Sequence, residues 1–439
     1  MCSIGVTNTS KSLLNSNKFS QRRGPDSTDL VTYNDVQFLH NLLHLTGNKT
    51  TQPFKKGDVV AVFNGEIYNY LDFGTYSTDG EILIDLYNEY GPEFIRQLDG
   101  EFAICLVDFS KDLVLISADT FACKPLWYEF KDGKFCVGSY NSQLTQLGFN
   151  SGRKLFANTT NVYNLKTSNL VQQFHNTEFD IKQYKNTYDD WITTYENSIR
   201  KRTSNAQYGI YLGLSSGYDS GAITCELLNQ NVDFKSYTIA GPENGRIIQQ
   251  RIDKIPNHEV IHLTQNEYDS SRTRLATECE DFVYQDKFRK YSIKGDKASY
   301  GLAAICKRAT KEGYRIYLSG QGADEIISDY GHNGRKIYNH SSFGGKFPED
   351  LNGFWPWHSF YDGTQIKYLN KEEYIAGHYG IETRYPFLDK QLVQEFLWLS
   401  AKLKNKKYKS VLHEYLTRNG FPFAEEKIGF NVLKNIKKG

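Results

Sequence analysis

The sequence has no long hydrophobic run, no C-x-x-C pair and no marked excess of charge of either sign. A membrane-spanning helix needs about 20 consecutive apolar residues, so the sequence predicts no membrane span, and its polar beginning predicts no signal peptide. The seven cysteines are scattered, which argues against a disulfide framework or a structural zinc site. With a net charge of +1, nothing indicates binding to nucleic acid or an anionic membrane. We therefore expect a cytoplasmic protein with small-molecule partners.

At 439 residues the chain suits two domains. In the first half, short apolar runs between turns predict strands, and apolar residues at helical spacing predict a helix over 80–90. The predicted strands are 59–63, 102–107, 114–118 and 126–130. This pattern favours an α+β domain of stacked antiparallel sheets flanked by helices. Polar residues over 175–186 place the boundary near residue 180.

In the second half, predicted strands and helices alternate along the chain. The strands are 208–214, 234–239, 260–263 and 315–318, and the helices are 222–228 and 299–312. Such alternation is typical of an α/β domain with a parallel sheet and crossover helices. Ligands of such sheets bind at the carboxyl ends of the strands, so these ends are the first places to look for a site.

Cys2 follows the initiator methionine directly. If Met1 is removed, one residue carries both a thiol and a free α-amine. The thiolate is a nucleophile, and an amine with a reference pKa near ~8 can move its proton. A cysteine at position 2 can also be an accident, so this reading depends on the residues downstream.

Two further places in the first half suit the same chemistry. Asn64 and Gly65 follow the strand 59–63, where a side-chain amide and a backbone N–H can serve a tetrahedral oxyanion. Asn-Gly is also a common turn pair. Asp79 opens the predicted helix, where it can cap the helix or hold the ammonium group of a substrate.

Two strand ends of the second half carry small and acidic residues. The run S-S-G-Y-D-S at 215–220 leads from a strand into a helix, where backbone N–H groups favour anions. No G-K-[ST] follows, so the loop suits a pyrophosphate better than a transferred γ-phosphate. The run S-G-Q-G-A-D-E at 319–325 follows the last strand. Asp324 can hold Mg²⁺ together with Asp219.

With these motifs in one order, the chain resembles the glutamine-dependent asparagine synthetases over nearly its whole length. The motifs that carry the resemblance are M-C-S-I at 1–4, R-G-P-D at 23–26, N-G-E-I-Y-N at 64–69, Asp79, L-D-G-E-F-A at 98–103, the loops 215–220 and 319–325, E-T-R-Y-P-F-L-D at 382–389 and K-I-G-F at 427–430. The resemblance implies an Ntn-hydrolase-like glutaminase domain over 2–180. It also implies a PP-loop, ATP-binding synthetase domain over 185–439.

The resemblance also implies a role for each matching residue. Cys2 attacks the glutamine amide, Asn64 and Gly65 form the oxyanion hole, and glutamine is held by Asp79, Asn64, Gly65, Glu66 and Arg23. ATP and its pyrophosphate are held by Leu214, Ser215, Ser216, Gly217, Asp219, Ser220, Ser319, Gly320 and Lys427. Lys427 stabilises charge on the phosphoryl groups, Gln321 occupies a catalytic position, and Asp219 and Asp324 bind Mg²⁺. The implied cofactors are ATP and Mg²⁺.

Three positions depart from the family pattern. Leu42 stands where an arginine usually clamps the α-carboxylate of glutamine, so Arg22 or Arg23 substitutes for it or the site has changed. Gln321 replaces a common glutamate and has no titratable group to act as a base. Ser216 and Gly221 replace the more usual glycine and serine of the pyrophosphate loop.

The sequence thus predicts an ATP-dependent, glutamine-hydrolysing ligase that adenylates a carboxylate and converts it to an amide. Aspartate is the leading acceptor, with asparagine, AMP, pyrophosphate and glutamate as products. An alternative is the same chemistry on a sugar acid or a modified amino acid. A different class of function is a non-catalytic sensor of glutamine or nucleotide. A homodimer is compatible with the sequence, which carries no direct signal of oligomeric state.

Overall fold

The computed structural model describes residues 2–241, 243–285 and 290–425, and the chain divides into two compact units. Unit 1 comprises Met1–Glu178, Glu278–Glu280 and Ala376–Glu382. Unit 2 comprises Phe179–Thr277, Asp281–Ile375 and Thr383–Gly439. Two short segments of the second half therefore belong to unit 1. Among the described residues, no helix is both long enough and apolar enough to cross a bilayer.

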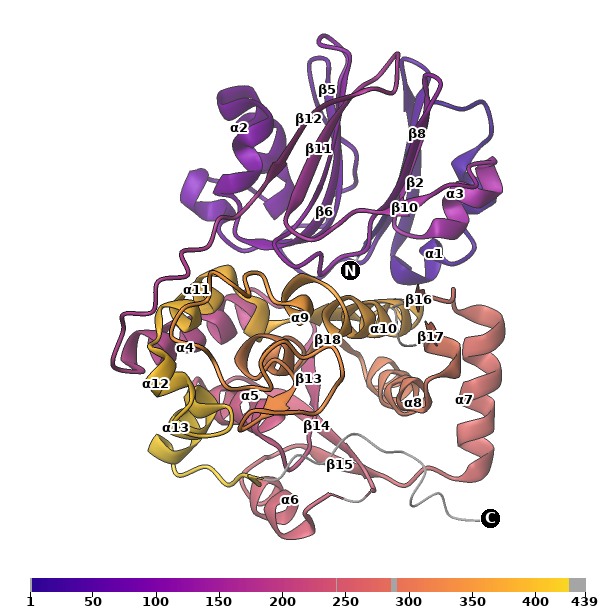
Figure 1. Ribbon diagram of the computed structural model, residues 1–439. Coiled ribbons are helices and arrows are strands. Elements are labelled where there is room, and N and C mark those ends of the chain that lie inside the picture. Colours follow the sequence, from indigo (N-terminus) through magenta and orange to yellow (C-terminus); the bar gives the residue numbers. More distant parts are fainter. Residues whose placement is uncertain (1, 242, 286–289, 426–439) are drawn as a thin grey trace. The chain divides into compact units, whose positions relative to one another are not determined.

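Unit 1 is built on two six-stranded sheets whose paired strands are antiparallel (Figure 1). One sheet has the order β10-β8-β9-β1-β3-β2, and the other has the order β12-β11-β7-β6-β5-β4. The strands are β1 Ser3–Thr7, β2 Ser27–Tyr33, β3 Val36–Leu42, β4 Phe54–Lys56, β5 Val59–Ile67, β6 Gly100–Asp108, β7 Leu113–Ala118, β8 Trp127–Lys131, β9 Lys134–Gly138, β10 Arg153–Lys154, β11 Thr159–Asn164 and β12 Leu170–His175.

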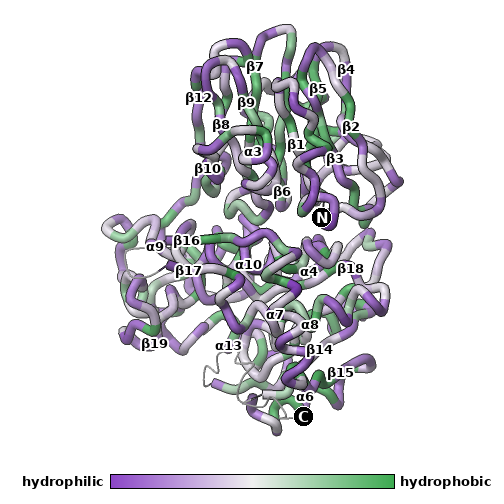
Figure 2. The backbone as a smooth tube through the Cα atoms, turned by 90° about the vertical axis from the view of Figure 1, so that its right-hand side faces the viewer, coloured by the Kyte–Doolittle hydropathy of each residue, from purple (hydrophilic) through white to green (hydrophobic). Residues whose placement is uncertain are grey.

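Alternating side chains of β5 explain the layers of unit 1. Val60 and Val62 join Ile4 and Phe38 of the other sheet in one core, which lies between the two sheets. Ala61 and the other odd-numbered residues face a second core, which contains helix α2 (Ile82–Tyr90). Figure 2 shows the hydrophobic colour concentrated along β1, β5 and β7. Helix α3 (Asn141–Leu147) packs on the outer side of the first sheet, and α1 spans Ser20–Arg23. The predicted stacked sheets with flanking helices are confirmed.

Strand β5 is longer than the sequence predicts. Asn64 and Gly65 do not follow the strand but lie within it, paired with Ala103 and Phe102 of β6. Gly65 has φ of 136°, and a Cβ there would lie 1.9 Å from the carbonyl oxygen of Glu101. Only glycine fits this close approach of two strands. The Asn-Gly pair is therefore a kink inside a buried strand and not a hairpin turn.

Unit 2 contains a five-stranded sheet of order β15-β14-β13-β18-β21, in which β13 to β15 and β18 pair in parallel. Its strands are β13 Gly209–Gly213, β14 Phe234–Ile239, β15 His258–Ile261, β18 Tyr314–Leu318 and β21 Glu382–Arg384. The helices are α4 Asp189–Thr203, α5 Tyr218–Asn229, α6 Gly245–Ile252, α7 Gln265–Glu278, α8 Lys297–Lys311, α9 His358–Tyr361, α10 Thr364–His378, α11 Lys390–Trp398, α12 Ala401–Lys404 and α13 Ser410–Arg418. This confirms the predicted parallel α/β domain.

Two short hairpins complete unit 2 and lie close to its main cavity. They pair β16 (Val283–Gln285) with β17 (Lys290–Ser292), and β19 (Gly331–His332) with β20 (Arg335–Lys336). The predicted phosphate-stabilising residue, Lys427, lies outside the described residues.

Two candidate active sites

Cys2 lies directly before β1 and is buried, with 8% of its surface exposed. Its Sγ lies 3.8 Å from the carbonyl oxygen of Leu43. Burial raises the pKa of this thiol to about 11. Since only the thiolate is an effective nucleophile, the thiol in this setting needs a base or a nearby positive charge before it can react. A freed α-amine on the same residue would supply both.

Asn64 is completely buried, yet neither polar atom of its side chain has a hydrogen-bond partner among the described residues. Buried amides almost always have partners, and an orphaned one costs about 1–3 kcal/mol. An amide kept free at this cost is available to a ligand. Its neighbour Gly65 turns its backbone out of the regular strand. Both observations suit the predicted oxyanion hole.

Asp79 begins the 3₁₀ helix Asp79–Glu81 and is buried. Its carboxylate accepts hydrogen bonds from the backbone N–H of Ile67 at 2.9 Å and from the hydroxyl of Thr78 at 3.2 Å. Burial, together with the negative charge of Glu382, raises the pKa of Asp79 to about 6. Glu66 and Glu382 also raise the pKa of Cys2, so this part of unit 1 is negative. An ammonium group is the ligand that such a site favours.

The two arginines that are candidates to replace the family's carboxylate clamp have other partners. Arg23 is fully buried, and its Nε donates to the backbone oxygen of Cys2 at 2.9 Å. Arg22 pairs with Glu278 at 2.8 Å, near the surface of the same unit. Leu42 ends β3 and is buried. Arg23 thus holds the backbone of the candidate nucleophile, a contact that the sequence does not predict.

In unit 2, the loop between β13 and α5 has the form of an anion cradle. The Ser215 N–H donates to the hydroxyl of Ser220 at 3.0 Å, which folds the loop against the first turn of α5. Arg251, fully buried, donates to the backbone oxygens of Ser215 and, at 2.9 Å, of Gly217. The Arg251 guanidinium therefore binds the backbone carbonyls of the loop. The backbone N–H groups of the loop can then face a ligand.

A carboxylate already occupies part of this cradle. Glu243 accepts hydrogen bonds from the backbone N–H of Ser216 at 2.8 Å and from its hydroxyl at 2.6 Å. A pyrophosphate oxygen could accept the same two hydrogen bonds, one from a backbone N–H and one from a hydroxyl of this loop. ATP bound here would therefore displace Glu243 from Ser216.

Asp219 and Asp324 converge on one cation, as the sequence predicts for Mg²⁺, but the cation is a lysine. The buried Lys409 lies 2.6 and 2.7 Å from the two carboxylate oxygens of Asp219 and 2.9 Å from Asp324. Two carboxylates and the oxygens of a bound phosphate fit the usual Mg²⁺ site. Among the described residues, no cluster of three or more metal-ligating side chains is present. Mg²⁺ here would therefore depend on the nucleotide for its remaining ligands.

One cavity of about 930 Å³ in unit 2 connects these features. Such a volume is at the upper end of known ligand sites, which suits two substrates bound together. The residues that line it are Ser215, Gly217, Tyr218, Asp219, Glu243, Lys290, Tyr291, Ser292, Gly295, Asp296, Lys297, Ala298, Gln321, Asp324, Tyr330, Tyr338, Lys367, Tyr368, Lys371, Tyr408 and Lys409. Ser319 and Gly320 follow β18, and Gly320 lies against Asp219.

Gln321 has an acidic neighbour that the sequence does not reveal. Burial raises the pKa of Glu372 to about 7, and the nearby side chains of Ser319 and Gln321 oppose this rise. The side chain of Gln321 therefore lies close enough to Glu372 to affect its pKa. A titratable group thus lies behind the position where the family usually has glutamate.

The raised pKa of Glu372 predicts a pH-dependent stability. Since the folded-state pKa of about 7 lies above the usual 4.5, stability falls as pH rises between these values and is constant above 7. Glu372→Gln removes this loss, so the variant should gain on the order of 3 kcal/mol over the wild type between pH 4.5 and 8. Chemical denaturation across this range measures it. The exposed Glu349→Gln is the control, and equal pH profiles of the wild type and Glu372→Gln would contradict the prediction.

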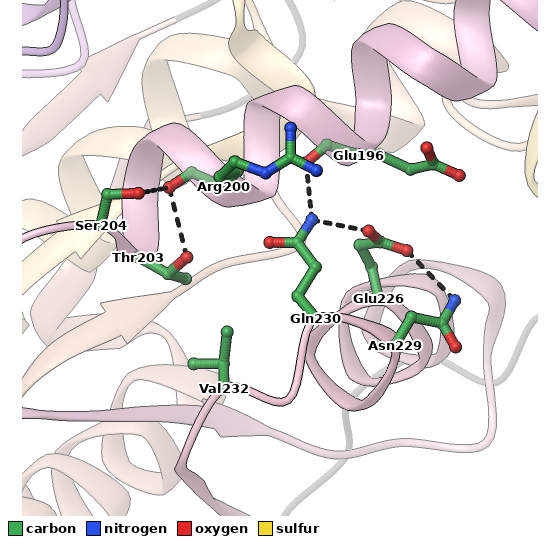
Figure 3. Close-up of a pocket in the computed structure, with 8 residues that line it drawn as sticks. All are labelled: Glu196, Arg200, Thr203, Ser204, Glu226, Asn229, Gln230 and Val232. Carbon is green, nitrogen blue, oxygen red and sulfur yellow. Dashed lines mark hydrogen bonds between the residues drawn. The ribbon is translucent and has the colours of Figure 1, made fainter.

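A second hollow of about 580 Å³ in unit 2 lies between α4 and the end of α5 (Figure 3). Its polar side chains satisfy one another: Gln230 donates to Glu226 at 2.6 Å and to the backbone oxygen of Glu196 at 2.8 Å. Glu226 also accepts from Asn229 at 3.2 Å and from Tyr415. Because these partners are all internal, the hollow is explained by packing.

The sequence misses four residues at these sites: Arg251, Glu243, Glu372 and Lys409. Lys409 meets Asp219 across 190 residues, and Arg251 meets Gly217 across 34. No local sequence pattern identifies these residues, because their partners are brought next to them only when the chain folds. Only the acidic neighbours of Lys409 were recognisable, as strand-end residues.

Comparison with known proteins agrees with both units. Residues 1–186 match the glutamine amidotransferase domain family, and residues 193–364 match the asparagine synthase family. A putative glutamine-hydrolysing asparagine synthetase 1 of Methanocaldococcus jannaschii is 27% identical and covers 91% of this chain and 75% of its own. Asparagine synthetase B of Escherichia coli is 25% identical, over 87% of this chain and 71% of its own length. Asparagine synthetase 2 of rice is 24% identical, over 92% of this chain and 69% of its own length.

Solved structures are less similar. A glutamine phosphoribosylpyrophosphate amidotransferase from B. subtilis covers 93% of this chain at 11% identity, with a TM-score of 0.33. The fold therefore rests on the strand order described above. Unit 1 has the stacked antiparallel sheets and unit 2 the parallel sheet, and each matches one of the two domain families. Together they define a glutamine-hydrolysing amidotransferase fused to a synthetase. The chain belongs to the glutamine-dependent asparagine synthetase family.

Proposed function

We propose that the protein is an ATP-dependent ligase that hydrolyses glutamine and uses the ammonia to convert a carboxylate into an amide. The observation that carries the proposal is the cavity of unit 2. It joins an anion cradle to two carboxylates, Asp219 and Asp324, that share one cation. This arrangement suits a nucleotide that loses pyrophosphate, and family membership supports it.

In unit 1, the Cys2 thiolate attacks the side-chain amide carbon of glutamine. Asn64 and Gly65 donate to the oxygen that becomes negative, and ammonia leaves with the proton taken by the α-amine. Water then hydrolyses the thioester, which releases glutamate and restores the thiol. Asp79 and Glu66 hold the ammonium group of glutamine.

In unit 2, an oxygen of the acceptor carboxylate attacks the α-phosphorus of ATP, and the bond to pyrophosphate breaks. The loop 215–220 holds the pyrophosphate, and Asp219 and Asp324 would hold Mg²⁺, which neutralises phosphate charge when bound. Ammonia attacks the carbonyl carbon of the acyl-adenylate, AMP leaves, and one proton is lost. Gln321 accepts a hydrogen bond from the ammonia with its amide oxygen, and Glu372 is a titratable group beside it.

Two classes of acceptor follow from different observations. The relatives are named asparagine synthetases, which makes aspartate the first acceptor to test. The lysines and tyrosines that line the cavity favour a different carboxylate. A non-catalytic sensor of glutamine or nucleotide would bind these ligands without turning them over.

The experiment is to measure pyrophosphate and glutamate release with ATP, Mg²⁺ and glutamine, with and without aspartate. Release of pyrophosphate that depends on a carboxylate acceptor is the expected result. Glutamate without aspartate-dependent pyrophosphate would support the ligase on another acceptor. If neither product forms with any carboxylate, the ligase proposal fails and the sensor replaces it.

Asn64→Ala tests the oxyanion hole. Loss of one preorganised donor should lower kcat for glutamine hydrolysis by roughly 10²–10³-fold, with a much smaller change in KM. Glutamate release measures it, and synthesis from free ammonia should be unchanged. The buried Asn17, which pairs with Asn41, offers a matched amide for the control Asn17→Ala. A change in KM with kcat unaltered would contradict the assignment.

A further inference from the structure

One end of the main cavity of unit 2 is lined by four phenol rings. The tyrosine wall, as we call it, consists of Tyr291, Tyr330, Tyr338 and Tyr368. The Tyr338 and Tyr368 hydroxyls lie 2.9 Å apart, and the Tyr330 and Tyr338 rings meet edge to face with centroids 4.8 Å apart. The wall therefore combines flat apolar faces with hydroxyl groups.

Lysines of α10 lie against this wall. Lys367 Nζ is 4.7 Å from the ring centroids of both Tyr291 and Tyr368, although only 6% of the residue is exposed. Lys371, one turn further along α10, lies 4.4 Å from the ring of Tyr368. Lys290 and Lys297 line the same end and are exposed. This end of the cavity therefore carries four cationic side chains.

The carboxylates of the lining already have partners. Asp296 accepts from Tyr291 at 2.9 Å and from the backbone N–H of Ala298 at 3.0 Å, and it lies 3.5 Å from Lys371. The remaining three, Asp219, Asp324 and Glu243, belong to the nucleotide end, where Lys409 and Ser216 hold them. Asp324 also lies near the tyrosine wall, since its charge adds to burial in raising the pKa of Tyr330, and Glu372 lies near Lys371. Among the described lining residues, Asp296 is the one carboxylate that pairs with a lysine of α10.

These charges disfavour an amino acid acceptor. When the side-chain carboxylate of aspartate is adenylated, its α-ammonium group remains and would lie among the four lysines. Like charges repel each other, and burial strengthens this repulsion. A ligand with a second anionic group and no ammonium group has the complementary charge.

We propose that the acceptor is a uronic acid that carries a phosphate ester, with its carboxylate as the group that is amidated. The inference rests on the proposed function and names its substrate class. The sugar ring would lie on the phenol faces, and the tyrosine hydroxyls would bind its hydroxyls. Lys367 and Lys371 would bind the phosphate as point charges. The carboxylate would face Gln321 and the α-phosphorus of ATP.

The first test supplies ammonium chloride in place of glutamine and measures pyrophosphate release with ATP and Mg²⁺. The probes are glucuronic acid 1-phosphate, galacturonic acid 1-phosphate, free glucuronic acid and L-aspartate at equal concentrations. We expect a phosphorylated uronic acid to give at least roughly tenfold faster release than aspartate, the factor that about 1.4 kcal/mol of discrimination provides. Release with aspartate alone would overturn the inference and leave the ligase intact. No release with these or any other carboxylate would overturn both.

The second test uses variants of the two lysines. Lys367→Met and Lys371→Met should each raise KM for the phosphorylated acceptor by roughly 10–100-fold, because a charge-assisted hydrogen bond is lost. KM for ATP should not change. Lys307→Met, on the exposed side of α8, is the matched control. Because Lys367 is buried, Tyr338→Phe provides a milder change if thermal unfolding shows that Lys367→Met is not folded. An acceptor KM that is unchanged in the folded variants would overturn the inference.

Discussion

Cys2→Ala should abolish glutamine-dependent synthesis while synthesis from free ammonia continues. The substitution removes the proposed nucleophile, and loss of a covalent nucleophile typically costs roughly 10⁴-fold or more in kcat. The ammonia-driven reaction needs only the cavity of unit 2, whose residues the substitution does not touch. Glutamate release and pyrophosphate release, measured on the same preparation with glutamine and then with ammonium chloride, separate the two activities.

The matched control is Cys105→Ala. Cys105 is another fully buried thiol of unit 1, but it lies in the core between the two sheets. Its removal should lower stability by about 1–2 kcal/mol and leave glutamine hydrolysis measurable. If Cys2→Ala keeps glutamine-driven synthesis, the nucleophile is wrongly assigned. If it loses both activities equally, the substitution acts on the fold and not on the chemistry.

A second measurement addresses the state of the thiol. Burial raises the pKa of Cys2 to about 11, so little thiolate exists near neutral pH in this setting. Mass spectrometry of the purified protein shows whether Met1 is removed. A protein that retains Met1 should hydrolyse glutamine slowly, because its amine is not on the residue that carries the thiol.

The sequence was sufficient for the fold because its signals are local. The apolar run of β5 and the strand–helix succession of β13 and α5 are both visible within short windows of the sequence. The Asn64-Gly65 pair shows the limit of this reasoning. Its local signal indicates a turn, but pairing with β6 continues the strand through it. Tertiary pairing decided the conformation there.

The candidate sites divide in the same way. The candidate residues that stand in recognisable motifs are Cys2, Asn64, Asp79, Asp219 and Asp324. The side chains that set their charge are distant in sequence. Glu382 lies near Asp79 because a segment of the second half joins unit 1, and Lys409 meets Asp219 across the whole of unit 2. The proposed acceptor site is also made of residues distant in sequence, which explains why the motifs predict the reaction more readily than the substrate.

Asp324→Asn should eliminate pyrophosphate release, with a decrease of roughly 10³-fold or more, while glutamine hydrolysis survives. The amide keeps the shape of the side chain but loses the charge that Mg²⁺ requires, and Mg²⁺ on the phosphates provides several kcal/mol of transition-state stabilisation.

Asp324 is a better choice than Asp219 for this test. Asp219 contacts Lys409 with both carboxylate oxygens, at 2.6 and 2.7 Å, so its loss would leave a buried ammonium with only one partner. In Asp324→Asn, Lys409 keeps the pair with Asp219, so the fold should survive. Asp350→Asn, on an exposed carboxylate, is the control. Full pyrophosphate release by Asp324→Asn, at saturating ATP and limiting Mg²⁺, would show that the two carboxylates serve only to hold Lys409 in place.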